Sequence, residues 1–381
     1  MRKRRKLIPV LLLSLAAAGC SNAAADSCRQ GIEAYQAGNY TKAIGLFGQA
    51  ITQDGTKAEY YNKKGMAQCA AADYSGALSS FERALSVDAA SAEAYRGMGL
   101  VYRKQGAYDQ AIEQFDQALA CIEKEADELR LDILAYRAEA KSILGDTDGA
   151  IADYQALLEQ NYCPEETYRL LGDQYAKQKD VAKALITYQN VINLDYKNLS
   201  HYLQIAKMLG TCGFSEEKQM VLETALTVEA ENGTMHYERG QIELELGDQK
   251  AAFSEFEQAY NMGCQEAGYY LGYCYELWEQ YSEAELLYQK QLTVSPDDAG
   301  IYNQLAICKM KQEQYSEALV FLKRGISCAD RDTLGDLLWN KAVCYEKLHQ
   351  FSGAIEAMEQ YVEQYPDSKS GIQELAYLKS R

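Results

Sequence analysis

The chain has 381 residues, of which 48% are hydrophobic and only four are prolines, so it can bury an extended core and run in long helices. Its formal net charge of −17 at pH 7 repels phosphate backbones and disfavours binding of nucleic acid. The charge also keeps a protein soluble without any specific partner.

The chain begins with a basic run from Arg2 to Lys6, followed by an apolar stretch from Leu7 to Ala18. This stretch is shorter than the ~20 residues that a membrane-spanning helix needs. A basic run, a short apolar region and then small residues are typical of an export signal. We therefore predict a signal peptide over residues 1–19.

The end of this segment, Ala17-Ala18-Gly19-Cys20, resembles a bacterial lipobox, although that family usually has leucine where Ala17 stands. The resemblance implies that Cys20 carries a diacylglyceryl group and that residues 20–26 form a lipidated tether. It also implies a location on the extracytoplasmic side of a membrane of the bacterial cell envelope. The alternative is an ordinary signal peptide cut after Ala23-Ala24-Ala25, which would give a soluble secreted protein.

From residue 24 onward the chain repeats itself at intervals near 34 residues. The clearest copy covers residues 92–119. There a first helix carries Gly99 and Tyr102, a turn follows at Gly106, and a second helix carries Ala111 and Phe115. The copies start near 24, 58, 92, 131, 165, 199, 233, 265, 299 and 335, which predicts an all-α chain.

This pattern is similar to the tetratricopeptide (TPR) repeat, a helix-turn-helix unit with small residues where the two helices cross. The resemblance implies a right-handed superhelical solenoid of about ten repeats over residues 24–367. It also implies a concave groove, lined by the first helices, that binds protein or peptide partners.

Three segments depart from the regular repeat. Residues 368–381 place Ile372, Leu375, Ala376 and Leu378 at helical spacing, which predicts a capping helix. The longer interval between the third and fourth copies predicts a longer second helix around residues 123–129. In the sixth copy Lys218 and Leu222 stand where the third has Ala111 and Phe115, so we expect this copy to pack worst.

No constellation of catalytic or metal-binding residues emerges from the sequence. Its three histidines, His201, His236 and His349, lie in different copies, and no CxxC or phosphate-binding motif is present. We therefore predict no enzymatic activity, no cofactor and no metal. Cys274, Cys308 and Cys344 share one seat in successive copies, which fits either a redox or metal ladder or, as we favour, a small buried residue.

The groove-facing seats suggest where a partner would bind. In copies two and three they form a basic to mixed patch of Asn62, Lys63, Arg96, Arg103 and Lys104. In later copies they become aromatic, with Tyr237, Tyr269, Tyr273 and Trp339. Exposed aromatic side chains on a rigid face are typical anchors of a binding surface, but rings at these seats can also pack against one another.

These patterns favour a membrane-anchored extracytoplasmic scaffold that binds an exported or envelope protein through its groove. A glycan- or cell-wall-recognising envelope protein is the alternative, because aromatic rings together with carboxylates also hold sugars. In the stretch Gly268–Trp278, we expect Leu271, Tyr275 and Trp278 to face the core and Tyr269 and Tyr273 to face the groove.

Overall fold

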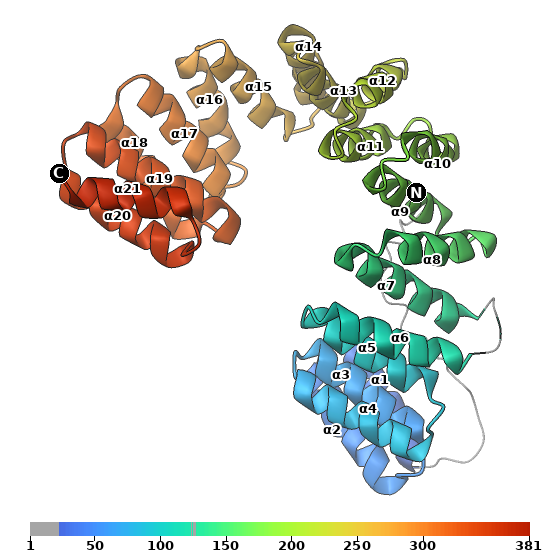
Figure 1. Ribbon diagram of the computed structural model, residues 1–381. Coiled ribbons are helices and arrows are strands. Elements are labelled where there is room, and N and C mark those ends of the chain that lie inside the picture. Colours follow the sequence, from blue (N-terminus) through green and yellow to red (C-terminus); the bar gives the residue numbers. More distant parts are fainter. Residues whose placement is uncertain (1–22, 123, 125–126) are drawn as a thin grey trace. The chain divides into compact units, whose positions relative to one another are not determined.

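The computed structural model describes residues 23–122, 124 and 127–381, and these residues form 21 helices and no strand (Figure 1). The helices come in consecutive pairs joined by short turns. The first helices are α1 (Ala23–Gln36), α3 (Ala58–Ala70), α5 (Ala92–Lys104), α7 (Glu128–Leu144), α9 (Pro164–Lys177), α11 (Leu199–Thr211), α13 (Gly233–Leu246), α15 (Ala267–Leu277), α17 (Ala299–Lys311) and α19 (Arg331–Lys347). The second helices are α2 (Tyr40–Gln53), α4 (Tyr74–Val87), α6 (Tyr108–Ala120), α8 (Thr147–Glu159), α10 (Val181–Leu194), α12 (Ser215–Leu226), α14 (Gln249–Asn261), α16 (Tyr281–Leu292), α18 (Tyr315–Cys328) and α20 (Phe351–Gln364).

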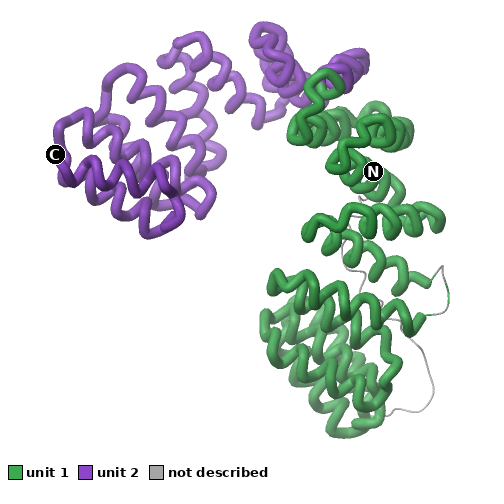
Figure 2. The backbone as a smooth tube through the Cα atoms, in the orientation of Figure 1, with its two compact units in different colours: residues 1–218 green, residues 219–381 purple. Residues whose placement is uncertain are grey.

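The chain divides into two compact units, one up to Lys218 and one from Gln219 to Arg381 (Figure 2). The boundary falls inside α12, the second helix of the sixth copy. This is the copy whose second helix departs most from the repeat pattern.

In six of the pairs, a glycine on the first helix meets an aromatic ring on the following second helix. A Cβ atom added at Gly99 would lie 2.5 Å from the Phe115 ring, and one added at Gly172 would lie 2.4 Å from the Tyr188 ring. Phe115 and Tyr188 are almost completely buried. The pairing of small with large seats therefore explains why the two helices of a pair pack so closely.

A residue with positive φ precedes the start of the second helix in every pair. Half of these residues are glycine, which adopts this backbone conformation without steric cost. The ten residues are Gly38, Ala72, Gly106, Gly145, Lys179, Gly213, Gly247, Glu279, Glu313 and His349. In several pairs the next residue caps the second helix, as where Asp73 accepts a hydrogen bond from the Gly76 backbone N–H at 3.0 Å.

The structure corrects two expected boundaries. Helix α6 ends at Ala120, and the extra residues of this interval precede or extend α7, so the prediction of a longer second helix is wrong. Asp127 caps α7 and lets that helix start early. Helix α1 begins at Ala23, so residues 23–26 belong to a helix and not to a tether. The predicted signal peptide and Cys20 lie outside the described residues.

The C-terminal helix α21 (Lys369–Lys379) forms where a capping helix is predicted, and it packs on α20. Leu378 is buried and Leu375 is half-buried, but Ile372 and Ala376 are exposed. The contact of α21 with the last pair is therefore narrower than the spacing of its apolar residues predicts. Within the described ranges, no helix combines the length and apolar character needed to cross a bilayer.

Candidate partner-binding surface

Positions that are equivalent from one copy of the repeat to the next are called seats. The candidate surface consists of the first-helix seats equivalent to Glu93, Arg96, Leu100, Arg103 and Lys104 of α5. We call this surface the first-helix face. In TPR arrays these seats line the groove, and every predicted partner-binding residue except Lys63, which is equivalent to Gly97, falls at one of them. The contacts that each side chain makes decide whether it is available to a partner.

Arg96 is not available to a partner, because it is buried in an ion pair between two first helices. Its Nε donates to Asp132 Oδ2 of α7 at 2.5 Å, and the two side chains are only 8% and 9% exposed. The Tyr136 ring lies 5.7 Å from the guanidinium carbon. Burial raises the pKa of Asp132, and the charge of Arg96 opposes that shift.

Arg103 is also engaged within the fold. Its Nη2 donates to Glu139 Oε1 of α7 at 2.7 Å, and its guanidinium carbon lies 5.2 Å from the Tyr136 ring centroid. Lys104, the next residue, is exposed. Thus the predicted basic patch on α5 is largely neutralised by acidic residues of α7.

Asn62 and Lys63 of α3 are paired in the same way. Asn62 is buried, and its Nδ2 donates to Ser91 Oγ at 3.0 Å and to Glu93 Oε2 at 3.3 Å. Lys63 Nζ lies 3.1 Å from Glu59 Oε1. Of the five predicted polar residues, only Lys104 presents an exposed side chain without a described ion-pair partner, so the predicted patch is corrected to a mainly structural ladder of contacts.

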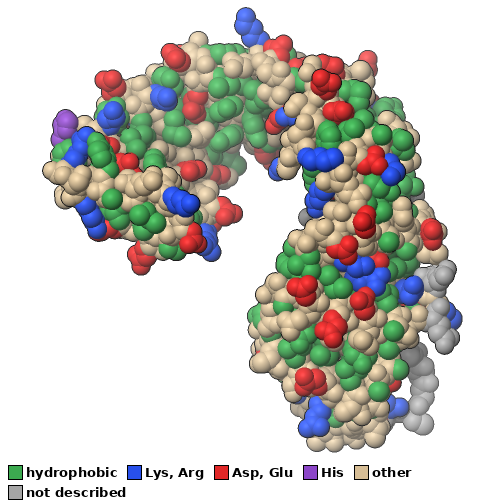
Figure 3. Space-filling view, viewed as in Figure 1, with side chains coloured by type: hydrophobic (Ala, Val, Ile, Leu, Met, Phe, Trp, Pro, Cys, Tyr) green, Lys and Arg blue, Asp and Glu red, His purple; other side chains and the backbone are tan. Residues whose placement is uncertain are grey.

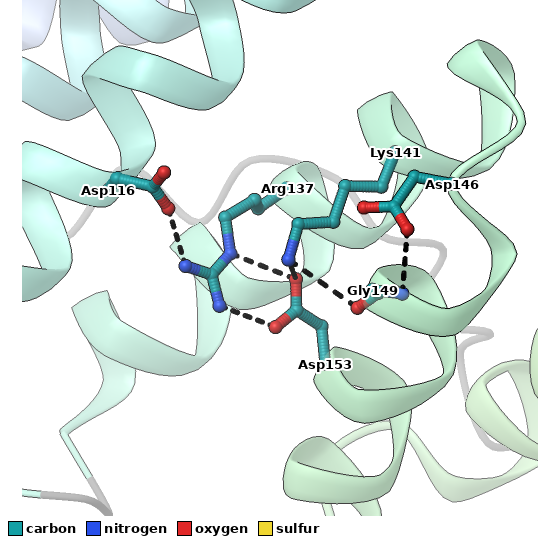
Figure 4. A network of polar contacts seen from close by, with 6 residues as sticks. All are labelled: Asp116, Arg137, Lys141, Asp146, Gly149 and Asp153. Carbon is teal, nitrogen blue, oxygen red and sulfur yellow. Dashed lines mark hydrogen bonds and ion pairs between the residues drawn. The ribbon is translucent and has the colours of Figure 1, made fainter.

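A second polar network joins α6, α7 and α8 (Figure 4). Arg137 donates from Nη1 to Asp116 Oδ1 at 2.6 Å and from Nε to Asp153 Oδ2 at 2.9 Å. Lys141 Nζ also donates to Asp153 Oδ2, at 3.0 Å. Because Asp153 is buried and satisfied by two cations, this network holds helices together and offers no free group.

In the second unit, Tyr237 packs as part of an aromatic cluster. Its ring lies 5.5 Å from Tyr270 and 6.1 Å from Phe256, measured between centroids. Gln241 Nε2 donates to the hydroxyl oxygens of Tyr237 and Tyr270 at 3.2 and 3.0 Å. Tyr237 is therefore half-buried and contributes mainly to packing between α13 and α15.

Tyr269 and Trp339 are half-buried in the same manner. The Tyr269 ring lies 5.4 Å from Tyr270 and 5.7 Å from Tyr288. The Trp339 ring stands edge-on to Tyr361, 5.4 Å away. These two residues contribute to packing within the fold and expose only part of their rings.

Tyr273 differs from the other predicted aromatic residues because it is exposed. Its side chain is 36% accessible, and Leu277, one turn further along α15, is 38% accessible. The seat of Tyr273 is occupied by half-buried Ile307 in α17 and half-buried Val343 in α19. We call these four residues the apolar strip.

The apolar strip is bordered by two exposed lysines. Lys311 of α17 and Lys347 of α19 occupy the same seat, and the ion pairs of the described residues involve neither. The nearby carboxylates are already engaged. Glu276 accepts a hydrogen bond from the Tyr288 hydroxyl, and Glu346 lies 3.6 Å from Arg381. Burial raises the pKa of the Glu276 carboxyl group and the charge of Lys311 counteracts that shift, so acidic and basic groups lie together beside the strip.

The stretch Gly268–Trp278 divides broadly as predicted. Leu271 is buried, and Tyr275 and Trp278 pack together against Phe253. Tyr273 points to solvent, whereas Tyr269 is shared between the surface and the core.

Figure 3 shows acidic and basic side chains interspersed over the visible face, with no large area of one sign of charge.

Sequence reasoning missed the hydrogen bonds of the buried tyrosines on the second helices. The Tyr188 hydroxyl donates to Asp173 Oδ1 at 2.8 Å, and the Tyr288 hydroxyl donates to Glu276. Burial raises the pKa of both tyrosines and of both carboxyl groups. A tyrosine where other copies have phenylalanine is the signal that could have indicated a polar partner on the first helix.

The three equivalent cysteines Cys274, Cys308 and Cys344 are fully buried free thiols. Burial raises the pKa of Cys274 to about 11 and that of Cys344 to about 12. Thiols of this kind are poorly reactive, because the thiolate is the nucleophile. Their burial agrees with a packing role.

Helix pairs that repeat one packing pattern in succession define a helical repeat protein of the interaction class. Models of the tetratricopeptide repeat match residues 62–126, 137–193, 279–335 and 336–368. The chain belongs to the tetratricopeptide repeat family. No curated protein sequence matches it.

Several solved structures are similar to the chain. Yeast Tom70 is 14% identical, with a TM-score of 0.48, and the match covers 94% of this chain and 88% of that one. A tetratricopeptide repeat protein from Parabacteroides merdae is 16% identical, with a TM-score of 0.43, over 64% and 94% of the two chains. PilW, a type IV pilus biogenesis factor, is 19% identical, with a TM-score of 0.45, over 56% and 97%. At these levels of similarity the matches do not indicate the partner of this chain.

Proposed function

We propose that the protein is a non-enzymatic scaffold, anchored by lipid on Cys20 to the extracytoplasmic side of a bacterial membrane. It binds a segment of another exported or envelope protein on the first-helix face of residues 219–381. The observation that carries this proposal is the apolar strip, in which Tyr273 and Leu277 are exposed side by side on a rigid helix. Exposed apolar side chains that adjoin one another on a rigid helix are typical of interaction sites.

The surroundings of the strip indicate the chemistry of the partner segment. Apolar side chains would cover Tyr273 and Leu277, and an acidic group would meet Lys311 or Lys347. Half-buried Tyr269 and Trp339 offer the exposed parts of their rings on the same first-helix face. Because the rings at this surface lie on helices, the site needs little ordering when the segment binds.

The first experiment is a pulldown from membranes of the native organism. The full-length protein and two matched double variants of it are each used as bait. Tyr273→Ala/Leu277→Ala should weaken capture of the specific partner at least tenfold, because two exposed anchors each contribute more than about 1 kcal/mol. Leu194→Ala/Tyr196→Ala removes an even more exposed leucine and tyrosine from another part of the chain and serves as the control.

The same variants distinguish the alternative of glycan recognition. Isolated cell-wall material should bind all three proteins equally poorly if the partner is a protein. Selective loss of cell-wall binding in the Tyr273→Ala/Leu277→Ala protein would instead favour the envelope glycan. Unchanged capture of every protein by that variant would contradict a binding role for the strip.

The membrane anchor is tested separately by labelling cells with palmitate. The wild-type protein should take up label and fractionate with membranes, and Cys20→Ala should do neither. A Cys20→Ala protein that still takes up label, or a wild-type protein without label, would contradict lipid attachment at Cys20.

A further inference from the structure

Two successive second helices of the C-terminal unit expose a large apolar residue at the same seat. Leu286 of α16 is 69% accessible and Val320 of α18 is 66% accessible. Both are more exposed than any residue of the apolar strip. This surface lies on the second helices, so it is separate from the proposed partner-binding surface on the first helices.

The charged residues around these two seats follow a common order. An exposed glutamate lies three residues before each apolar residue, Glu283 before Leu286 and Glu317 before Val320. A basic residue lies four residues after, Lys290 and Arg324 respectively. Residues three and four apart share one face of a helix, so each helix presents acid, apolar and base in a line.

These charges remain accessible to a partner, although most have a contact within the chain. Glu317 lies 3.2 Å from Lys309 and Arg324 lies 3.4 Å from Asp297, and the Glu317 and Arg324 side chains are 60% and 58% exposed. Lys290 lies over the Tyr260 ring at 4.8 Å. Exposed pairs of this kind are weak and can be exchanged for intermolecular ones.

We propose that this surface binds a second copy of the chain, with α16 and α18 packed antiparallel on the same helices of that copy. In such a two-fold contact the axis is perpendicular to the helices and lies in the plane of the interface. Leu286 then meets Leu286 of the second copy, and Glu283 meets Lys290. The corresponding contacts on α18 are Val320 with Val320 and Glu317 with Arg324.

The charges favour this antiparallel arrangement over a face-to-face contact whose two-fold axis runs parallel to the helices. An axis parallel to the helices would pair α16 with α18 in the same direction and place Glu283 against Glu317. Like charges in contact oppose association, whereas the antiparallel arrangement brings opposite charges together at both ends. The surface is thus complementary to itself in one orientation only.

Two helix faces make a small interface, of the class below about 1,200 Å² in total, and such interfaces are weak. We expect dissociation constants in the micromolar range or above. Copies anchored in one membrane would associate more readily, because confinement raises their effective concentration. This last step depends on the proposed anchor, whereas the contact itself does not.

The test is sedimentation of the full-length protein in density-matched detergent over a range of concentrations, with thermal melting as a check on folding. The wild-type protein should form dimers as its concentration rises. Glu283→Lys should weaken association at least tenfold, and Glu283→Lys/Lys290→Glu should restore it to within about threefold, because the swapped charges again meet opposite charges. Leu286→Glu should also weaken association at least tenfold, because it places like charges against each other at the axis. Ile186→Glu, at the same seat of α10, is its matched control and should leave association unchanged.

A cysteine at the two-fold axis gives an independent readout in cells. Leu286→Cys should form a disulfide-linked dimer under mild oxidation, because that residue meets itself, and Ser282→Cys one turn away should not. A wild-type protein that stays monomeric at every concentration would overturn the proposal. So would dimers that persist equally in Glu283→Lys and Leu286→Glu, or a charge swap that fails to restore association.

Discussion

Single residues of the first-helix face have two different roles, although they lie on the same face of their helices. Arg96 and Tyr273 both point away from the packed stripe of their helices. Arg96 is buried by Asp132 of the next first helix, whereas Tyr273 has no such cover and is 36% exposed. The role of each residue is therefore decided by what the neighbouring repeat places beside it.

Removal of Arg96 should strongly destabilise the first unit. Arg96→Ala leaves the buried carboxylate of Asp132 without its cation, which costs about 3–5 kcal/mol for a buried pair. The double variant Arg96→Met/Asp132→Leu should recover most of this loss, because both charges are then absent. Urea unfolding measures all three proteins, and equal stability of the two variants would contradict the assignment.

The pH dependence of this variant follows from the direction of the pKa shift. Burial already raises the pKa of Asp132, and loss of Arg96 raises it further. A carboxyl group with a raised folded-state pKa favours the folded state while it is protonated and loses that effect as pH rises. The free energy of unfolding that Arg96→Ala loses relative to wild type should thus be larger at pH 7 than at pH 4.

At the residue scale the sequence predicts packing better than it predicts polar contacts. The seats of Gly99, Phe115 and Tyr288 follow from a repeat period that one chain displays many times. The ion pair of Arg96 with Asp132 joins two copies. It depends on how neighbouring first helices are placed against each other, which the repeat period does not predict. Four predicted cationic or amide residues consequently have partners within the fold, and only Tyr273 among the predicted aromatic residues is well exposed.

At the scale of the element, each pair of helices depends on close approach at one small seat. A Cβ at Gly99 would lie 2.5 Å from a carbon of the Phe115 ring, and Phe115 is fully buried. Gly45 of α2 has no neighbour within 4 Å of an added Cβ. The two glycines lie on helices but differ in what surrounds them.

These two glycines make a matched test of the packing. Gly99→Ala should lower the free energy of unfolding by about 1–3 kcal/mol through overpacking. Gly45→Ala should raise it by about 0.5–1 kcal/mol, because alanine favours the helix and meets no obstacle. Thermal melting distinguishes them, and a Gly99→Ala protein as stable as wild type would show that the ring can move aside.

The ends of elements were harder to predict than their existence. Each first helix begins close to its predicted start, but α6 ends at Ala120 and α7 begins at Glu128, against the expected extension of α6. The sequence period does not show whether extra residues between two helices lengthen the first helix, the connection or the second helix. Here the cap at Asp127 places them in the connection and at the start of α7. Local capping, which a period does not reveal, makes that choice.

At the scale of the whole molecule, the chain consists of two compact units whose boundary lies in α12. The same copy has Lys218 and Leu222 where the regular copy has Ala111 and Phe115. Replacing an alanine and a ring by a long charged chain and a smaller aliphatic group weakens the contact between the helices of the pair. We expect this copy to be the least stable part of the array.

Hydrogen exchange tests this expectation directly. Amides of residues 199–232 should exchange at least about tenfold faster than those of residues 92–120, because local opening requires less free energy where packing is poorer. Lys218→Ala should slow exchange in the same segment and leave residues 92–120 unchanged. Equal protection of the two segments would contradict the weak-copy prediction.

The left-handed turn that closes each helix pair also bears on how such a chain reaches its folded state. Because the turn sits within the pair, the first contacts to form join residues close in sequence, and folding does not wait for distant segments. The two helices of a pair can come together once about forty residues have emerged, and the next pair then packs against them. A chain that emerges end first can therefore fold progressively as it appears, with the uncovered apolar face confined to the growing end of the array.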